Sequence, residues 1–376
     1  MSKRINSFFQ PIPSKKPKPD PEATSPSSPS PTPVVSTHHS NYPMPIRNLP
    51  SHIFKPIANL ERVRPPQAIN NQPHLDLLYF QPFIPSPIAR DLFKFLRNEL
   101  PFYRVQYTIR RGPAETLINT PRYTTVFGVD ETSIFIPGSQ DIATTNPKPP
   151  KPIGDGNASS ESTQTQTSTL TLVESRTRAP PTTLKDKAKY NHPPRPIPPC
   201  LDVLRQAVEA ATADGTHYNF CLVNYYATGD DSISYHSDDE RFLGPNPTIA
   251  SISLGGQRDF MLKHKPVAGS DVDAGKPLKF PLNSGDMIVM RGETQANWLH
   301  SIPKRKGAQG NQGRINITFR KAVVPGGTNN YYRYNVGDGA VYRWDDLSKR
   351  MVAVKKEKET EGEKESQTVN EVKVKE

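Results

Sequence analysis

The sequence predicts a mostly β (α+β) fold, a two-sheet jelly roll with flanking helices, and two observations lead to this prediction. The first is a series of short strand-like segments in the second half of the chain, separated by Gly, Pro or Asn. These segments are Ile249–Leu254, Asp259–Lys263, Leu278–Leu282, Asp286–Arg291 and Arg314–Arg320. The second observation is that two segments upstream show helical periodicity, which predicts helices in addition to the strands.

The upstream half of the domain contains both kinds of element. Pro87–Leu100 predicts an amphipathic helix with Ile88, Leu92 and Leu96 on one face, and Cys200–Ala211 predicts a second helix. Strands are expected where apolar residues alternate or cluster: Arg104–Ile109, Tyr123–Val129 and Phe220–Tyr226. The segment 331–343 is expected to add a strand or to cover a sheet edge.

Composition divides the chain into three parts. Residues 1–70 contain 15 prolines and Ser-rich stretches, which predicts a disordered, basic tail. Residues 71–349 form the folded domain, interrupted by an insertion at about 138–190 that is poor in large apolar residues and is expected to be disordered. Residues 350–376 alternate Lys and Glu, which predicts a charged tail that is either helical or disordered.

Charge and cysteine content narrow the classes of protein. The net charge is +11, and residues 1–70 contribute +6 of it, which makes a polyanionic partner plausible without establishing one. No apolar run is long enough for a membrane span, and no secretory signal follows the first residues. Two cysteines, Cys200 and Cys221, fit a reducing compartment rather than a disulfide scaffold.

A His-x-Asp motif and a later histidine predict a metal site. His236 and Asp238 are two residues apart, so on a strand their side chains share a face. His300 follows from a later turn and strand. Two imidazoles and one carboxylate form the facial triad of non-haem Fe(II) sites, which leaves coordination positions open. A zinc-binding jelly roll without oxidation chemistry is an alternative.

The strand Arg314–Arg320 predicts an anion site beside this metal. Arg314, Asn316, Thr318 and Arg320 share one face, whereas Ile and Phe residues occupy the other. Guanidinium groups bind carboxylates or phosphates in bidentate fashion, so this face is suited to a carboxylate ligand. Asn224 and Tyr226 share a face of an earlier strand and could donate further hydrogen bonds.

In combination, these motifs resemble the AlkB family of Fe(II)/2-oxoglutarate-dependent dioxygenases, and in particular its eukaryotic nuclear DNA-repair branch. The resemblance covers roughly residues 75–325 and rests on Asn224–Tyr226, His236–Glu240, Pro247–Gly255, Asn297–His300 and Arg314–Arg320. It implies a double-stranded β-helix (jelly roll) dioxygenase core preceded by a nucleotide-recognition lid.

The resemblance also implies the cofactors and their ligands. Fe(II) would be held by His236, Asp238 and His300, with O2 as the oxidant. The co-substrate 2-oxoglutarate would be held by six residues: Asn224, Tyr226, Arg314, Asn316, Thr318 and Arg320. The activity implied is oxidative demethylation of N1-methyladenine and N3-methylcytosine in DNA, with release of formaldehyde.

Substrate contacts are expected from three residues of the resembling segments. Glu240 matches a position that touches the base, Asp239 lies next to it, and Phe127 would be the aromatic residue beneath a flipped base. A base inside a duplex cannot reach a buried metal, so it must first be flipped out. The structural alternative for Phe127 is an ordinary core phenylalanine.

The N-terminus carries a separate signal. Peptides that bind the sliding clamp (PCNA) have an aliphatic residue, a gap of two residues and then two aromatic residues. This spacing is present at Ile5, Phe8 and Phe9, although Ser2 stands where such peptides usually have a leading Gln. We therefore expect a nuclear, monomeric enzyme with DNA and the clamp as partners and no membrane association. Two alternatives remain: an RNA demethylase of the same family, or a catalytically weak scaffold bound to the clamp.

Overall fold

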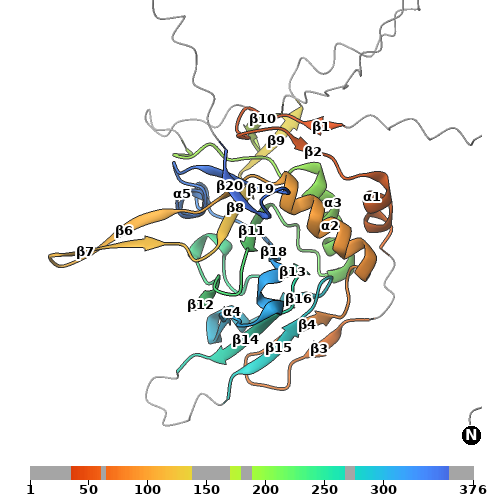
Figure 1. The fold of residues 1–376 in the computed structure, drawn as a ribbon, viewed down its shortest axis with the longest axis vertical. Helices are drawn as coiled ribbons and strands as arrows, with labels where there is room; N and C mark the ends of the chain where they lie inside the picture. The colour runs from red at the N-terminus through yellow and green to blue at the C-terminus, as the bar shows by residue number, and fades with distance from the viewer. Residues whose placement is uncertain (1–34, 61–64, 138–169, 179–188, 267–275, 355–376) are drawn as a thin grey trace, which may run out of the picture. The chain divides into compact units, whose positions relative to one another are not determined.

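A computed structural model describes residues 35–60, 65–137, 170–178, 189–266 and 276–354. Within these residues antiparallel strands dominate, as Figure 1 shows. The mostly β fold class and the jelly-roll core are therefore confirmed.

Ten strands form the larger sheet, in the order β20-β19-β5-β8-β11-β18-β13-β16-β4-β3. In chain order its members are β3 (Gln67–Ile69), β4 (Leu77–Phe80), β5 (Phe102–Tyr103), β8 (Tyr123–Gly128), β11 (Phe220–Tyr226), β13 (Ile249–Gly255), β16 (Met287–Met290), β18 (Arg314–Arg320), β19 (Val341–Asp345) and β20 (Arg350–Ala353). The Arg-rich strand β18 lies between β11 and β13, in the middle of this sheet.

Four strands form the smaller sheet, in the order β12-β17-β14-β15. They are β12 (Ile233–His236), β14 (Arg258–His264), β15 (Leu278–Leu282) and β17 (Trp298–Ile302). Three two-stranded pairs complete the described strands: β1 (Ser36–Thr37) with β2 (Ile46–Arg47), β6 (Gln106–Arg111) with β7 (Ala114–Asn119), and β9 (Ser133–Pro137) with β10 (Leu170–Glu174). The β6–β7 hairpin extends away from the sheets in Figure 1.

Three helices lie together along one side of the larger sheet (Figure 1). They are α1 (Ser51–Ala58), α2 (Ser86–Glu99) and α3 (Pro199–Thr212). In α2, Ala89, Leu92 and Leu96 are buried at helical spacing, and a proline in the first turn suits the start of the helix. Two shorter helices, α4 (Thr294–Asn297) and α5 (Asn329–Asn335), lie near the strands that carry the polar motifs.

The larger sheet separates two hydrophobic clusters, because successive side chains of a strand point to opposite faces. On β11, Cys221, Val223 and Tyr225 pack with the helices in one cluster. Leu222 and Tyr226 belong to the second cluster, which also contains Phe260 and Leu262 of the smaller sheet. The two sheets therefore pack face to face, and the polar face of β18 is turned into the space between them.

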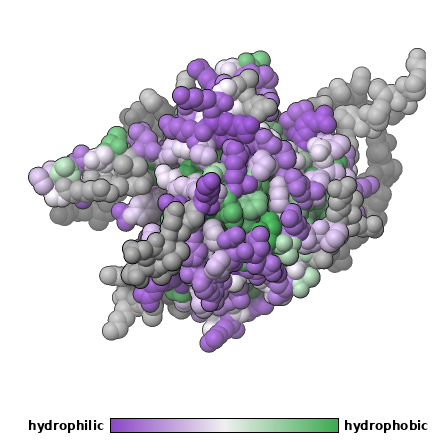
Figure 2. Space-filling view, turned by 90° about the horizontal axis from the view of Figure 1, so that it is seen from below, coloured by the Kyte–Doolittle hydropathy of each residue, from purple (hydrophilic) through white to green (hydrophobic). Residues whose placement is uncertain are grey.

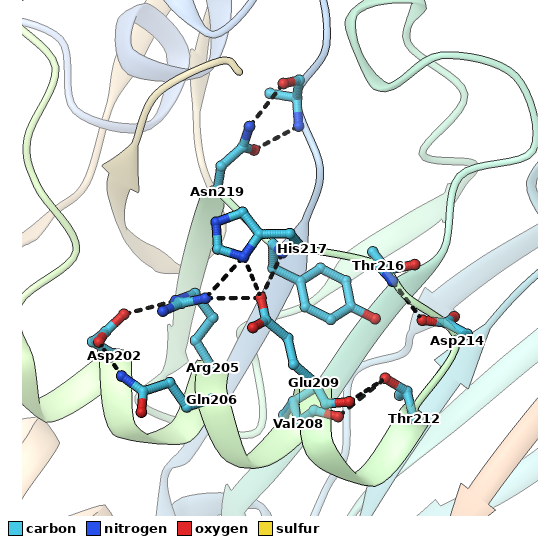
Figure 3. A network of polar contacts seen from close by, with 12 residues as sticks. Asp202, Arg205, Gln206, Val208, Glu209, Thr212, Asp214, Thr216, His217 and Asn219 are labelled. Carbon is cyan, nitrogen blue, oxygen red and sulfur yellow. Dashed lines mark hydrogen bonds and ion pairs between the residues drawn. The ribbon is translucent and has the colours of Figure 1, made fainter. Parts of the chain in front are cut away.

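The segment between α3 and β11 is held by a polar network, shown in Figure 3. Glu209 accepts hydrogen bonds from Arg205 at 2.8 Å and from the backbone N–H of Tyr218 at 2.8 Å. The Asn219 amide donates to the carbonyl oxygen of Ala322 at 2.9 Å and accepts from its N–H at 2.7 Å. The Glu209 contacts join α3 to the segment before β11, and the Asn219 contacts join that segment to Ala322, two residues after β18.

The folded domain begins earlier than the sequence predicts. Residues 35–60, which we assigned to a disordered tail ending at 70, contain β1, β2 and α1. Ile46, Ile53 and Ile57 are fully or almost fully buried in the same cluster as α2 and α3. A few well-spaced apolar residues are enough to order a proline-rich segment when they can pack on an apolar surface, which α2 and α3 provide here.

Two further boundaries also differ. Within the predicted insertion 138–190, β10 pairs with β9 along its whole length and Val173 is buried. Tyr190 is also buried and donates a hydrogen bond to Asp130 at 2.7 Å. At the C-terminal end, β20 begins at Arg350 and completes the larger sheet, whereas residues 355–376 of the predicted tail lie outside the described residues.

The face seen in Figure 2 is mostly hydrophilic, with hydrophobic residues gathered near its middle and a few others at its edges. Among the described helices, none is long and apolar enough to cross a membrane.

Candidate active site

A cavity of about 450 Å³ lies between the two sheets. It is lined from the larger sheet by Leu222, Asn224 and Tyr226 of β11 and by Asn316, Thr318 and Arg320 of β18. Alternation along the two strands explains this lining, because the intervening residues point into the helix-side cluster. A volume of this size is in the range of small-molecule sites.

The three predicted metal ligands converge at this cavity. His236 at the end of β12 and His300 of β17 form a cross-strand pair, and their ring centroids are 4.2 Å apart. Asp238 follows β12 by two residues, and its Oδ1 lies 3.8 Å from His236 Nε2. One ligand atom from each residue lies within 4.8 Å of the other two. Within the residues that the structure describes, this is the one group of three or more His, Cys, Asp or Glu side chains with such geometry.

Hydrogen bonds and burial prepare these groups to bind a cation. His236 Nδ1 lies 2.9 Å from the Ser234 carbonyl oxygen, so its N–H donates there and Nε2 is left with a lone pair. The backbone N–H of Asp238 donates to Gln295 Oε1 at 2.8 Å, which ties the ligand to α4. Burial lowers the pKa of His300 to about 3, so this imidazole is neutral, the form that binds metals.

Arg320 forms an ion pair with Asp238. Its Nη2 donates to Asp238 Oδ2 at 2.6 Å, and both side chains are only 4% exposed. Burial alone would raise the pKa of Asp238, but the Arg320 guanidinium lowers it overall, with smaller contributions from the two histidines. The sequence analysis assigned Arg320 to the co-substrate, whereas the structure shows it bound to a candidate metal ligand. Arg320 Nε and Nη1 remain buried without a protein partner, so Arg320 could also bind a further anion.

Arg314 has the features expected of a carboxylate-binding residue. It is 1% exposed, and one nitrogen donates to Ser253 Oγ at 2.8 Å. Its Nε and Nη1 are buried and have no hydrogen-bond partner in the protein. The guanidinium carbon lies 5.3 Å from the centre of the Tyr226 ring, and burial lowers the pKa of Arg314 to about 10. A buried cation with unsatisfied donors is costly, so this site fits an anionic ligand.

The remaining predicted co-substrate residues line the same cavity, with some polar groups already engaged. Asn224 Oδ1 accepts a hydrogen bond from Arg122 Nε at 2.9 Å. The Asn316 amide donates to Ser251 Oγ at 2.8 Å and to the Ile252 carbonyl oxygen at 3.0 Å. Thr318 also lines the cavity. Five of the six predicted co-substrate residues therefore line the cavity, whereas Arg314 is absent from its wall and lies against the ring of Tyr226, which does line it.

The three predicted substrate residues behave differently from one another. Glu240 lines the cavity, and its Oε1 accepts a hydrogen bond from the Tyr331 hydroxyl at 2.7 Å. Asp239 forms an exposed ion pair with Lys265 at 2.8 Å and is absent from the cavity wall.

The prediction for Phe127 is wrong. The residue is fully buried in the helix-side cluster, with Tyr42 packed edge-on at 6.0 Å. It is opposite Cys221 in the β8–β11 register, and both point away from the cavity. The alternative reading, a core phenylalanine, is the one the structure supports.

Sequence reasoning missed a part of the wall that comes from α5. Asn330, Tyr331, Tyr334 and Asn335 line the cavity, and Arg122 lines it from the loop before β8. The cluster of Asn and Tyr in residues 329–335 was a visible signal, but we expected this region to be a strand or an edge cover. Ile5, Phe8 and Phe9 lie outside the described residues, so the clamp peptide stays a prediction.

Comparisons with known proteins agree with this geometry. The family described as the 2OG-Fe(II) oxygenase superfamily matches residues 151–320. A protein of Arabidopsis thaliana named DNA oxidative demethylase ALKBH2 is 39% identical over 140 residues, which are 33% of this chain and 43% of the relative. Its Homo sapiens namesake is 39% identical over 132 residues, or 35% of this chain and 49% of that protein.

A third relative is the alpha-ketoglutarate-dependent dioxygenase alkB homolog 3 of Rattus norvegicus, 39% identical over 124 residues, or 32% of this chain and 41% of that protein. The chain thus spans about half the length of the curated relatives it matches. The superfamily uses Fe(II), 2-oxoglutarate and O2. The residues present fit the first two: two histidines and a carboxylate could hold the metal, and Arg314, with two buried nitrogens that lack a protein partner, could bind a carboxylate of the co-substrate.

Proposed function

The chain belongs to the AlkB family of 2OG-Fe(II) oxygenases, and from that premise we propose that it repairs alkylated DNA by oxidative demethylation. The observation that supports this most directly is the cavity itself. The candidate metal triad lines a cavity between the sheets, and the buried Arg314, which has two nitrogens without a protein partner, lies against Tyr226 of the cavity wall. Metal and carboxylate sites held together in this way are what a 2-oxoglutarate-dependent oxidation requires.

We infer that N1-methyladenine and N3-methylcytosine are the substrates. Fe(II) held by His236, Asp238 and His300 would supply the oxidation: with 2-oxoglutarate and O2 it would give succinate, CO2 and a hydroxylated N-methyl group, which is lost from the base as formaldehyde. The protein's own residues hold the participants. Arg314 binds the co-substrate carboxylate, Arg320 keeps Asp238 ionised for the metal, and Glu240 accepts a hydrogen bond from the base.

The base reaches this cavity only if it leaves the helix stack, because the triad lies between two sheets. The basic N-terminal residues would assist by attracting the phosphate backbone. We further propose that the protein acts in the nucleus and binds the sliding clamp through Ile5, Phe8 and Phe9, which rests on the sequence pattern alone.

The test is an incubation of the full-length protein with Fe(II), 2-oxoglutarate and short oligonucleotides that contain one N1-methyladenine or one N3-methylcytosine. Matched DNA and RNA strands are compared, and methyl loss is followed by mass spectrometry together with formaldehyde release. We expect demethylation of DNA that disappears in His236→Ala and His300→Ala variants. Faster turnover of RNA than of DNA would favour the RNA demethylase, and turnover that survives loss of either histidine would contradict the assignment of the metal site.

A further inference from the structure

Helix α5 contributes to the cavity although it lies beyond the part of the chain that matches the family. The family match ends at residue 320, whereas α5 covers Asn329–Asn335. Four of its residues line the cavity: Asn330, Tyr331, Tyr334 and Asn335. This part of the cavity wall therefore comes from outside the segment that matches the family.

Contacts to neighbouring elements fix α5 in place. The Tyr332 hydroxyl donates to the Gly128 carbonyl oxygen at 2.7 Å and accepts from the Arg195 N–H at 2.8 Å. The Thr124 hydroxyl of β8 donates to the carbonyl oxygen of Asn335 at 2.6 Å. A short helix anchored at its middle and its end can hold a side chain in a defined position, which a recognition site requires.

Tyr331 is the α5 residue with the most informative contacts. Its hydroxyl donates to Glu240 Oε1 at 2.7 Å. Its ring packs edge-on against Phe220 and Phe242, with ring centroids 5.4 Å and 5.2 Å apart. The guanidinium of Arg320 lies 5.4 Å from the ring centre, and Arg320 in turn pairs with Asp238. Tyr331 thus connects the carboxylate on the cavity wall with the side chains around the candidate metal site.

We propose that Tyr331 is a positioning residue that sets base specificity through Glu240, an inference that rests on the proposed demethylase function. The Tyr331 hydroxyl occupies Oε1 and restricts the rotation of the carboxylate, so Oε2 is held for the substrate. A fixed carboxylate accepts hydrogen bonds only. It therefore favours bases with an amino group beside the methylated nitrogen, as in N3-methylcytosine, over N3-methylthymine, which presents a carbonyl oxygen there.

The experiment measures binding, so that it does not depend on turnover. The full-length protein is loaded with Mn(II) and 2-oxoglutarate, and dissociation constants are determined for identical oligonucleotides that contain N3-methylcytosine, N3-methylthymine or unmodified cytosine. We expect Tyr331→Phe to reduce the preference for N3-methylcytosine over N3-methylthymine by about fivefold, the size of one hydrogen bond to a charged group at a partly exposed site. The affinity for 2-oxoglutarate should stay within about twofold of the wild type, since Tyr331→Phe keeps the ring that lies beside Arg320 and removes only the hydroxyl that bonds to Glu240.

A double-mutant cycle shows whether Tyr331 acts through Glu240. In a Glu240→Ala background, Tyr331→Phe should change the preference no further, because the group that it positions is gone. Tyr332→Phe is the matched control, since it removes a neighbouring buried hydroxyl that bonds to backbone groups away from Glu240. It should lower the thermal midpoint and leave the preference unchanged.

Two outcomes would overturn the role of Tyr331 alone: an unchanged preference in Tyr331→Phe, or effects of Tyr331→Phe and Glu240→Ala that simply multiply. A different result would remove the premise as well. If the wild-type protein binds 2-oxoglutarate but does not distinguish N3-methylcytosine from unmodified cytosine, then the demethylase function is wrong and the inference fails with it.

Discussion

At the scale of single residues, the two arginines of β18 have different partners and are therefore expected to have different roles. Arg320 forms an ion pair with Asp238, whereas Arg314 donates only to the neutral hydroxyl of Ser253, and each guanidinium retains two buried nitrogens without a protein partner. Both arginines lie on one face of β18, so the strand pattern alone could not distinguish them. The difference arises because Asp238 follows a strand of the other sheet and approaches only one end of β18.

Arg314 should dominate the affinity for the co-substrate. Arg314→Ala removes a buried charge-assisted contact, which costs about 2–4 kcal/mol, so we expect 2-oxoglutarate to bind roughly 30- to 1,000-fold more weakly. Calorimetric titration of the Mn(II)-loaded protein measures this. Arg291→Ala, which breaks an ion pair with Asp76 instead, is the control and should leave the affinity unchanged. An Arg314→Ala variant that binds 2-oxoglutarate normally would remove Arg314 from the site.

Arg320 should matter most when no metal is bound. Arg320→Met leaves the buried Asp238 carboxylate without its partner, and loss of one member of a buried pair costs about 3–5 kcal/mol of unfolding free energy. A divalent cation at the triad would compensate that charge. We therefore expect Mn(II) to raise the thermal midpoint of the variant by more than it raises that of the wild type. Equal shifts in the two proteins would mean that the cation does not bind at Asp238.

At the scale of elements, the additions to the two sheets come from segments that the sequence analysis treated as peripheral. Helix α1 and the strands β1 and β2 lie in the predicted tail, β10 lies in the predicted insertion, and α5 follows the last matched strand. Helix α1 packs in the same hydrophobic cluster as α2 and α3, Tyr332 of α5 packs in the cluster between the sheets, and β10 pairs with β9. Their local patterns are short, so their structure depends on the surface that receives them.

Helix α1 should contribute to stability as a part of the core. Ile57 is fully buried in α1, so Ile57→Ala is expected to reduce the free energy of unfolding by about 3 kcal/mol through lost burial and a residual cavity. Phe54 belongs to the same helix but is 45% exposed, and Phe54→Ala should cost less than about 1 kcal/mol. Denaturant unfolding of the full-length protein compares the two. Similar losses for both variants would indicate that α1 does not pack as the structure shows.

At the scale of the whole molecule, catalysis and partner binding are expected to reside in separate parts of the chain. The candidate active site lies within residues 120–335, whereas the clamp-binding pattern lies at residues 5–9, outside the described residues. The positive charge is densest in residues 1–70. Such a division would let clamp binding through residues 5–9 raise the local concentration of the enzyme on DNA without altering the catalytic site.

Replacing the two N-terminal phenylalanines should therefore remove clamp binding without affecting demethylation. Phe8→Ala combined with Phe9→Ala should abolish binding to the sliding clamp, because these rings supply most of the apolar surface of the motif. Demethylation of short oligonucleotides should be unaffected. Calorimetry with a peptide of residues 1–20 and its double variant gives the direct comparison. A wild-type peptide that shows no binding would show that the phenylalanines have another role.

The sequence by itself determined the fold class and the identity of the metal and co-substrate candidates. Period-two alternation places Arg314, Asn316, Thr318 and Arg320 on one face, and a two-residue spacing places His236 beside Asp238. The strands β11, β15 and β18 have the predicted boundaries. Such features are local, so they can be read from neighbouring residues along the chain.

Only the tertiary structure decided which face of the larger sheet each side chain occupies and what it meets there. It placed Phe127 in the helix-side cluster, paired Arg320 with Asp238, and brought Tyr331 to Glu240 across 91 positions of sequence. Strand order and sheet packing set these contacts, and neither is encoded in the spacing of adjacent residues. For the same reason, the ends of the folded domain followed from the surfaces available for packing rather than from local composition.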